Sequence, residues 1–317
     1  MTSQSDDPAT GVDQHCYRHP GEFAGVRCTR CDRPICPRCM TAASVGFQCP
    51  ECVSEGHRTV RQARTIYGGK VRPGTAPGLV TRTLIAINVI VFIITASSGA
   101  NIFSGSTGSS TVYDRFALIP VEVAHGQWYR LITAAFLHYG ILHIAFNMYA
   151  LFLVGPQLEM VLGRLRFVTL YVLAGIGGGL LSMALGPLGE QAAGASGAIF
   201  GLFGALYIVA RHLNLQTNGI AITIVANLVF TFAIPNIDWR AHVGGLVTGS
   251  AIALIVSRAP QGPRRSQIQA MGVGGVAILL AAGGFIGAQH TYDKCPILTT
   301  VHGIPTECRF PAPSTGT

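Results

Sequence analysis

Four polar side chains interrupt segments of the sequence that are otherwise apolar. Ser196 lies in Gly-Ala-Ser-Gly, His242 lies in Ala-His-Val-Gly-Gly, and a second histidine, His143, lies four residues before Asn147. Polar residues inside membrane-spanning segments are energetically costly, so each is a candidate functional group. A serine paired with a histidine can act as nucleophile and general base, which predicts acyl transfer, here peptide hydrolysis. His143 and Asn147 are then candidate donors to the oxyanion, together with the backbone amide of Ser196.

Charge is scarce in the elements that must position these residues. Of the 317 residues, 49% are hydrophobic and 11% are charged, whereas an ordinary soluble domain has roughly 25% charged residues. Most of the cysteines and much of the charge lie in about the first 70 residues. This composition excludes a disordered chain and predicts a small polar head on a multi-pass membrane body.

Seven apolar segments follow the head, and most approach the ~20 residues needed to cross a bilayer as a helix. They cover residues 83–97, 141–162, 167–185, 192–210, 219–234, 241–257 and 270–288, of which the fifth and sixth are short. Apolar and polar residues do not alternate in them, and irregular backbone is not tolerated in lipid. The segments are therefore predicted to be α-helices of an all-α polytopic membrane protein.

The arginines set the expected orientation in the membrane. The formal net charge is +8, and arginines precede the first apolar segment and recur in alternate later gaps. Cytoplasmic loops are enriched in arginine and lysine, so we expect a cytoplasmic N-terminus and an extracytoplasmic C-terminus in the cell membrane. Topology then accounts for the positive charge, and nucleic acid is not an expected partner.

The four candidate side chains lie near the beginnings of even-numbered segments, so this orientation places them at similar depth near the outer surface. Glycines supply the necessary geometry. Gly197 in the fourth segment and Gly245 in the sixth are small enough to let two membrane helices approach closely. A hydroxyl and an imidazole on those two helices can then form a hydrogen bond.

The head contains cysteines and one histidine in pairs, each pair separated by two residues. Pairs of this spacing, on tight turns, are typical of zinc ligands, and eight ligands make two tetrahedral sites. The candidate ligands are Cys16, His19, Cys28, Cys31, Cys36, Cys39, Cys49 and Cys52. We expect two structural Zn²⁺ ions, because about forty residues are too few to build a hydrophobic core.

The spacing of these pairs is similar to that of B-box and RING-like cross-brace modules. On that resemblance, one ion takes the first and third pairs, and the other takes the second and fourth. A sequential pairing stays open, and so does replacement of one ligand by His15 or His57. A cytoplasmic protein is a further candidate partner of this domain. Cys295 and Cys308, in the tail expected outside, can form a disulfide there.

The apolar body resembles the rhomboid family of intramembrane serine proteases over about residues 79–257. Three motifs carry the resemblance: Gly-x-Ser-Gly at 194–197, Ala-His-x-x-Gly at 241–245 and His-x-x-x-Asn at 143–147. Trp-Tyr-Arg at 128–130 is similar to the family's Trp-Arg signature, displaced by one residue. Glu159 and Gly163 match a Glu-x-x-x-Gly motif of the family.

The resemblance implies a six-helix bundle, here with one additional C-terminal helix, and a catalytic dyad of Ser196 and His242 that needs no acid and no cofactor. It assigns the oxyanion contacts to His143 and Asn147. Phe200 stands where many family members have a tyrosine that stacks on the catalytic histidine, and the phenyl ring can still pack there. The supporting residues that it implies are His138, Gly194, Gly197, Phe200 and Gly245.

The expected organisation has five parts. They are a zinc-binding domain at 1–60, a basic linker at 61–78, a protease domain at 79–257, a loop and seventh helix at 258–288, and a tail at 289–317. Transmembrane proteins are the expected substrates. The alternatives are a catalytically silent membrane adaptor of the same family and a membrane receptor in which the zinc domain carries the function.

Overall fold

The structure is a computed structural model that describes residues 15–59, 64–69, 76–101, 103, 110–234, 237–301 and 304–309, with the backbone alone from residue 298 onward. The chain divides into two compact units, Met1–Gln62 and Ala63–Thr317.

The first unit is small and has little regular structure. Two antiparallel hairpins, β1–β2 and β3–β4, are followed by one helix. The elements are β1 (Val26–Arg27), β2 (Pro34–Ile35), the 3₁₀ helix η1 (Pro37–Cys39), β3 (Thr41–Ala42), β4 (Phe47–Gln48) and α1 (Pro50–Thr59). Cysteines supply most of the buried residues of this unit, and Ile35 and Ala24 are the buried aliphatic ones. Such a core is too small to hold the unit together by hydrophobic burial alone.

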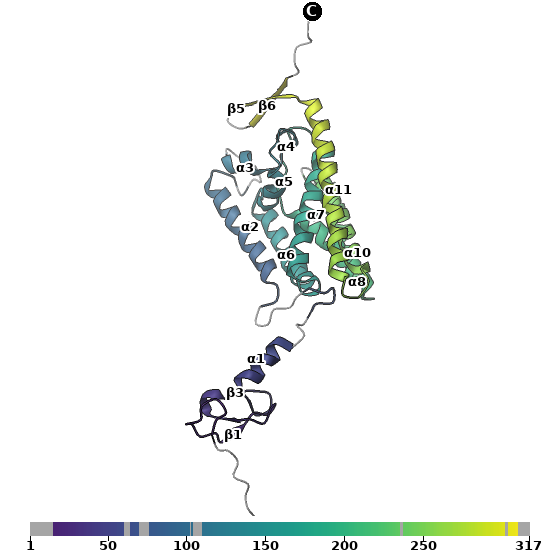
Figure 1. Ribbon diagram of the computed structural model, residues 1–317. Helices are drawn as coiled ribbons and strands as arrows, with labels where there is room; N and C mark the ends of the chain where they lie inside the picture. Colours follow the sequence, from purple (N-terminus) through teal and green to yellow (C-terminus); the bar gives the residue numbers. More distant parts are fainter. Residues whose placement is uncertain are drawn as a thin grey trace, which may run out of the picture. The chain divides into compact units, whose positions relative to one another are not determined.

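The second unit is a helical bundle (Figure 1). Its long helices are α2 (Leu79–Ser97), α6 (Ile141–Leu162), α7 (Arg164–Leu185), α8 (Ser196–His212), α9 (Asn218–Ala233), α10 (Trp239–Arg258) and α11 (Arg265–Lys294). Shorter elements lie between α2 and α6: α3 (Thr111–Phe116), α4 (Pro120–Ala124), α5 (Arg130–Thr133) and the 3₁₀ helix η2 (Ala134–Phe136). An antiparallel hairpin of β5 (Ile297–Val301) and β6 (Ile304–Arg309) follows α11.

Five of the described helices are long and apolar enough to cross a membrane: α2, α6, α7, α10 and α11. The apolar helices α8 and α9 have 17 and 16 residues. The predicted all-α polytopic architecture is thereby confirmed. The sequence predicts a short sixth apolar segment, and this prediction is wrong, because α10 begins at Trp239 and has 20 residues. The last helix extends beyond 270–288 at both ends and has 30 residues.

The fourth apolar segment differs most from its predicted start at residue 192, because α8 begins at Ser196. The residues before it pair with other loops. Leu118 and Ala192 exchange two backbone hydrogen bonds of 2.9 and 2.8 Å, and the Gly194 amide donates to the Ala134 carbonyl at 2.9 Å. An extended segment can satisfy these partners and a helix cannot, so Ser196 becomes the first residue of α8.

Helices α8 and α10 cross with their backbones in close contact at glycine residues. A Cβ atom on Gly245 of α10 would lie 1.9 Å from the Gly197 carbonyl oxygen of α8, and one on Gly249 would lie 2.2 Å from that of Gly201. Only glycine fits at such points. The pairing brings the first turns of the two helices together.

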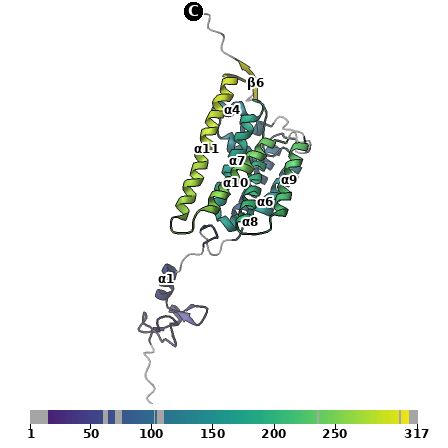
Figure 2. The same ribbon diagram turned by 90° about the vertical axis from the view of Figure 1, so that its right-hand side faces the viewer.

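Helices α9 and α11 lie at opposite sides of the bundle (Figure 2). Both expose many large apolar side chains, such as Ile222 and Phe232 on α9 and Ile278 and Leu279 on α11, as expected of surfaces that face lipid. Thr231 is the buried residue of α9. Most of α9 therefore faces away from the bundle, with one polar side chain directed inward.

The N-terminal end of α2 is fixed by a carboxylate on α6. Glu159 is 4% exposed and accepts hydrogen bonds from the backbone amides of Val80 and Thr81 at 3.1 and 3.0 Å, and from the Thr81 hydroxyl at 3.0 Å. These amides belong to the first turn of α2, which has no intrahelical acceptors for them. Glu159 is thus a helix cap supplied from another helix.

Candidate active site and candidate metal centres

Ser196 and His242 are in direct contact. Ser196 is the first residue of α8, and His242 lies in the first turn of α10. The His242 Nε2 atom lies 2.8 Å from the Ser196 Oγ atom. The imidazole is 7% exposed, so the contact lies in a largely water-excluded environment.

Thr231 of α9 contacts the other ring nitrogen of His242, and no pattern in the sequence marks this residue. Its Oγ1 atom lies 2.7 Å from His242 Nδ1 and 2.8 Å from the Asn227 carbonyl oxygen. The hydroxyl has one hydrogen, which it donates to that carbonyl, so its oxygen is left to accept from Nδ1–H. This arrangement leaves Nε2 unprotonated and able to accept the Ser196 hydroxyl proton.

Phe200 packs against the face of the same imidazole ring. It lies one turn after Ser196 on α8, and its ring stacks on that of His242 with centroids 4.2 Å apart and planes 13° apart. Stacking restricts rotation of the imidazole about its side-chain bonds. His242 is thus positioned at one nitrogen, at one face and by the hydrogen bond to Ser196.

His143 lies beside Ser196, with Gly194 between them. A Cβ atom on Gly194 would lie 2.8 Å from the His143 Nε2 atom and 3.6 Å from Ser196 Oγ. Gly194 also has φ of +137°, a conformation that L side chains rarely adopt. Glycine is therefore needed here both for its backbone conformation and for the approach of the His143 ring.

Asn147 lies one turn after His143 on α6, and its amide donates to the His143 carbonyl at 3.0 Å. Asn147 is 7% exposed. The side-chain amide carries a second N–H, which remains available for a bound group. The structure thus places both candidate oxyanion donors on one face of α6.

His138 is buried and its ring lies next to that of His143. The two ring centroids are 5.0 Å apart, and His138 is 1% exposed. Burial lowers the pKa of His138 to about 3, so the ring is neutral. Among the described residues, neither ring nitrogen has a hydrogen-bond partner.

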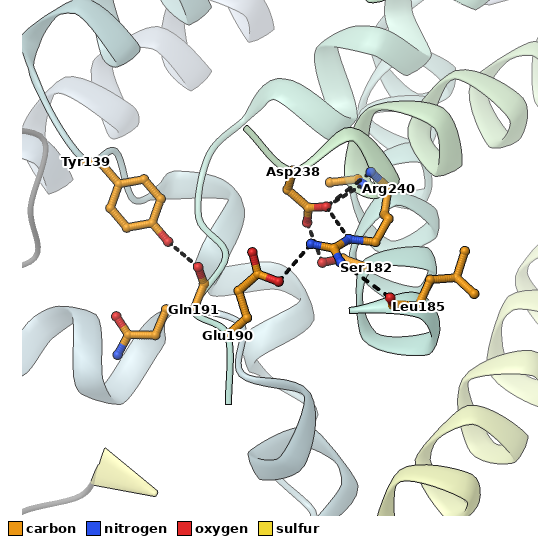
Figure 3. A network of polar contacts seen from close by, with 8 residues as sticks. Tyr139, Ser182, Leu185, Glu190, Gln191, Asp238 and Arg240 are labelled. Carbon is orange, nitrogen blue, oxygen red and sulfur yellow. Dashed lines mark hydrogen bonds and ion pairs between the residues drawn. The ribbon is translucent and has the colours of Figure 1, made fainter. Parts of the chain in front are cut away.

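A polar network ties the segment before Ser196 to the start of α10 (Figure 3). Arg240 donates to Asp238 Oδ1 at 2.9 Å and to Glu190 Oε2 at 2.8 Å. Asp238 is the N-cap of α10, where it accepts from the Arg240 and Ala241 amides, and the Ser182 hydroxyl of α7 donates to its other oxygen. This network fixes the first turn of α10, which carries His242, against the segment that leads into Ser196.

Tyr139 supports the same segment from the opposite side. Its hydroxyl donates to the Gln191 carbonyl at 2.7 Å (Figure 3), and its ring lies nearly parallel to that of His143, at 6.0 Å. Arg130, 2% exposed, anchors the preceding loop through the Ala117 and Asp114 carbonyls, both at 2.7 Å.

The cysteine-rich unit brings its eight candidate ligands together in two groups. In each group, the candidate ligand atoms lie within 4.8 Å of one another. One group is Cys16, His19, Cys36 and Cys39, and the other is Cys28, Cys31, Cys49 and Cys52. This grouping matches the cross-brace arrangement rather than the sequential one, and His15 and His57 belong to neither group. Three thiols with an imidazole, and four thiols, are donor sets that fit Zn²⁺.

Cys295 follows α11 and is disulfide-bonded. The side chain of Cys308, its predicted partner, lies outside the described residues.

Comparisons with known proteins agree with the fold of the second unit. The model of the Rhomboid domain family matches residues 125–259. The chain is 41% identical over 174 residues to the rhomboid protease GluP of Bacillus subtilis, an alignment that covers 53% of this chain and 33% of GluP. It therefore spans about a third of the length of that relative.

Two further relatives share this region. YdcA, a second rhomboid homologue of Bacillus subtilis, is 36% identical over 174 residues, which cover 53% of this chain and 87% of YdcA. RHOMBOID-like protein 5 of Arabidopsis thaliana is 35% identical over 147 residues, 44% of this chain and 47% of that protein. The alignment with YdcA extends over nearly its whole length, and the chain therefore belongs to the rhomboid family of membrane proteins.

Proposed function

We propose that this protein is an intramembrane serine endopeptidase that hydrolyses peptide bonds in or near the transmembrane segments of other membrane proteins. The hydrogen bond of 2.8 Å between Ser196 and His242 is the observation that carries the proposal. A serine and a histidine from different helices, the histidine held in one tautomer, form an activated nucleophile.

In the first step, the Ser196 Oγ atom attacks the carbonyl carbon of the scissile bond while His242 Nε2 accepts the hydroxyl proton. The tetrahedral oxyanion receives hydrogen bonds from His143, from Asn147 and from the Ser196 amide, which has no intrahelical acceptor at the start of α8. His242 then returns the proton to the leaving amine, and an ester of Ser196 remains.

In the second step, a water molecule attacks the ester while His242 accepts one of its protons. Collapse of the second tetrahedral intermediate releases the carboxylic acid and returns the proton to the Ser196 oxygen. Both steps use the same oxyanion donors, and no cofactor takes part.

The arrangement in the membrane follows from the positive charges. Arg164, Arg211, Arg258 and Arg265 lie at one end of the long helices, and cytoplasmic segments are enriched in such residues. We place this end, and the N-terminus, in the cytoplasm of a cell-membrane protein. Ser196 and His242 lie at the opposite ends of their helices, so cleavage takes place near the extracytoplasmic side of the membrane.

The test is proteolysis by the purified full-length protein in lipid vesicles. A single-span substrate with helix-breaking residues near its outer end is added, and mass spectrometry identifies the products. The proposal predicts cleavage within or next to the span in the wild-type protein. Absence of cleavage across a panel of such substrates, with the protein folded, would favour the silent adaptor instead.

Replacement of Thr231 by valine should lower kcat roughly 10- to 100-fold, because the valine cannot accept from His242 Nδ1 and the orientation of the general base is lost. Valine matches threonine in shape, so the packing of α9 should persist. Thr231→Ser retains the acceptor and should restore most of the activity. A valine variant with the wild-type kcat would show that Thr231 has no role in positioning the histidine.

The two cysteine clusters are proposed to bind one structural Zn²⁺ each, and the donor sets of the clusters support this. Elemental analysis of the purified protein should give two zinc ions per chain. The double variant Cys28→Ser/Cys49→Ser removes two ligands of one proposed site and should retain one ion. The same variant takes one ligand from each site under sequential pairing, so loss of both ions would contradict the cross-brace assignment.

A further inference from the structure

A basic cavity lies at the end of the bundle opposite to the serine and histidine. Its volume is about 800 Å³, and it is lined by Arg64, Gly68 and Gly69, by the start of α7, by the last turns of α10 and by the first turns of α11. Three arginines line it, namely Arg64, Arg164 and Arg166. None of the residues that we assign to catalysis is part of it.

The positive charges of this cavity are poorly neutralised. Arg164 lies 3.7 Å from Glu159, whose oxygens already accept hydrogen bonds from the start of α2. Within the part of the chain that the structure describes, Arg64 and Arg166 have no carboxylate partner. Arg265, which lies within electrostatic range of Arg166, also lacks one. Like charges repel one another unless an anion lies between them.

Buried contacts hold the cationic groups in fixed positions. Arg166 donates through Nε and one terminal nitrogen to Gln269 Oε1, at 2.9 and 2.6 Å. Gln269 is 3% exposed, and its own amide donates to the Tyr67 and Val256 carbonyls. The other terminal nitrogen of Arg166 makes no hydrogen bond within the described residues. The contacts with Gln269 thus fix the orientation of the guanidinium, and one of its terminal nitrogens is available to a ligand.

Arg265 is held in a similar way. It donates to the Ile66 carbonyl at 2.8 Å, and its guanidinium carbon lies 5.3 Å from the centre of the Tyr67 ring. Its Nε atom is buried and lacks a hydrogen-bond partner among the described residues. These contacts hold positive charges close to one another, although like charges repel. A bound anion would relieve this repulsion.

Much of the remaining wall of the cavity is apolar. Ile252 and Val256 of α10 and Val273 of α11 line it, and all three belong to helices long enough to span a membrane. A ligand that fills the whole cavity must combine a negative charge with hydrocarbon. Soluble phosphate satisfies the arginines alone, whereas a phospholipid satisfies both parts of the wall.

We propose that this cavity binds the headgroup phosphate of an anionic phospholipid, with the adjoining part of the acyl chains against α10 and α11. Arg64 and Arg166 contact the phosphate, and Gln269 orients Arg166. The site is independent of the catalytic proposal, because its lining residues and its expected ligand are different.

The test measures thermal stability of the purified full-length protein in detergent as lipid is added. Short-chain phosphatidylglycerol should raise the melting temperature in a saturable way, and phosphatidylcholine of the same chain length should not. Inorganic phosphate at the same concentration should leave the melting temperature unchanged. A shift of equal size with phosphatidylcholine would overturn the proposal, and so would reproduction of the whole shift by inorganic phosphate.

Two variants locate the site. Arg64→Gln and Arg166→Gln should each weaken the apparent affinity for phosphatidylglycerol roughly fivefold, the value of one cationic residue near an anionic lipid. The Arg64 side chain makes no hydrogen bond or ion pair within the described residues, so its replacement should not disturb the fold. Arg264→Gln removes the same charge from an exposed position outside the cavity and should retain the wild-type affinity. Equal losses in all three variants would show a nonspecific attraction to surface charge and would contradict the proposed site.

Discussion

Replacement of Ser196 by alanine is expected to abolish cleavage of a membrane-spanning substrate, a loss of about 10⁴-fold or more in kcat. The substitution removes the oxygen that attacks the carbonyl, and no other side chain in contact with His242 can replace it. Thr231, the other hydroxyl at His242, faces Nδ1 and donates its proton to the Asn227 carbonyl.

The folded structure should survive this change. Ser196→Ala removes one hydrogen bond, which contributes about 1 kcal/mol to stability, and alanine fits the first turn of α8. Ser250→Ala on α10 is the matched control, since its hydroxyl makes no hydrogen bond within the described residues and lies far along the helix from His242. Cleavage by the alanine variant at the wild-type rate, with the same melting temperature, would exclude Ser196 as the nucleophile.

Replacement of Gly245 by alanine should have the second largest effect, about 100-fold in kcat, although glycine has no side chain that could take part in the chemistry. The new Cβ atom would lie 1.9 Å from the Gly197 carbonyl oxygen, so α10 must move away from α8 by about 1 Å or more. A displacement of that size between two reacting groups can cost about 100-fold in rate. Overpacking should also destabilise the protein by about 1–3 kcal/mol.

The control for this variant is Gly275→Ala on α11, where a Cβ atom would meet no atom within 4 Å. It makes the same chemical change in an apolar helix and should leave the kcat and the melting temperature unchanged. Both variants are measured for cleavage and for thermal unfolding in the same detergent. Wild-type kcat in Gly245→Ala would show that the close crossing of α8 and α10 is not what positions the dyad.

The sequence was informative about the site wherever chemistry needs a residue type at a fixed position. Ser196, His242, His143 and Asn147 were recognisable because polar groups are rare in apolar segments. The glycines of α8 and α10 were recognisable because close helix contact admits few other residues. Such signals are local, and they do not depend on knowing how the segments pack.

Thr231 could not be found in this way. A threonine in an apolar helix satisfies its own hydroxyl by donating to a backbone carbonyl one turn earlier, as Thr223, Thr83 and Thr95 also do. It therefore carries no cost that would mark it as functional. Its contact with His242 depends on the way α9 packs against α10, which periodicity does not determine.

The start of α8 was predicted four residues too early for a similar reason. Residues 192–195 are apolar or small and continue the composition of the helix. Their backbone groups are instead used by Leu118 and Ala134, which lie far away in the sequence. The Arg166–Gln269 contact in the basic cavity also joins distant segments, and the composition of either segment alone gives no sign of it.

The cysteine-rich unit is a different case. The type and spacing of its ligands predicted two sites, but spacing alone left cross-brace and sequential pairing open. The three-dimensional grouping distinguishes these possibilities, because the two hairpins bring the first and third ligand pairs together and the second and fourth together.

The covalent bond made by a serine-reactive probe identifies which serine is activated for attack. Purified wild-type protein is treated with a fluorophosphonate, digested and analysed by mass spectrometry. We expect one adduct, on Ser196, and a loss of labelling in His242→Ala, because the imidazole must accept the hydroxyl proton. An adduct on a different serine, or labelling of Ser196 at the same rate without His242, would contradict the proposal that this serine and histidine act as a catalytic pair.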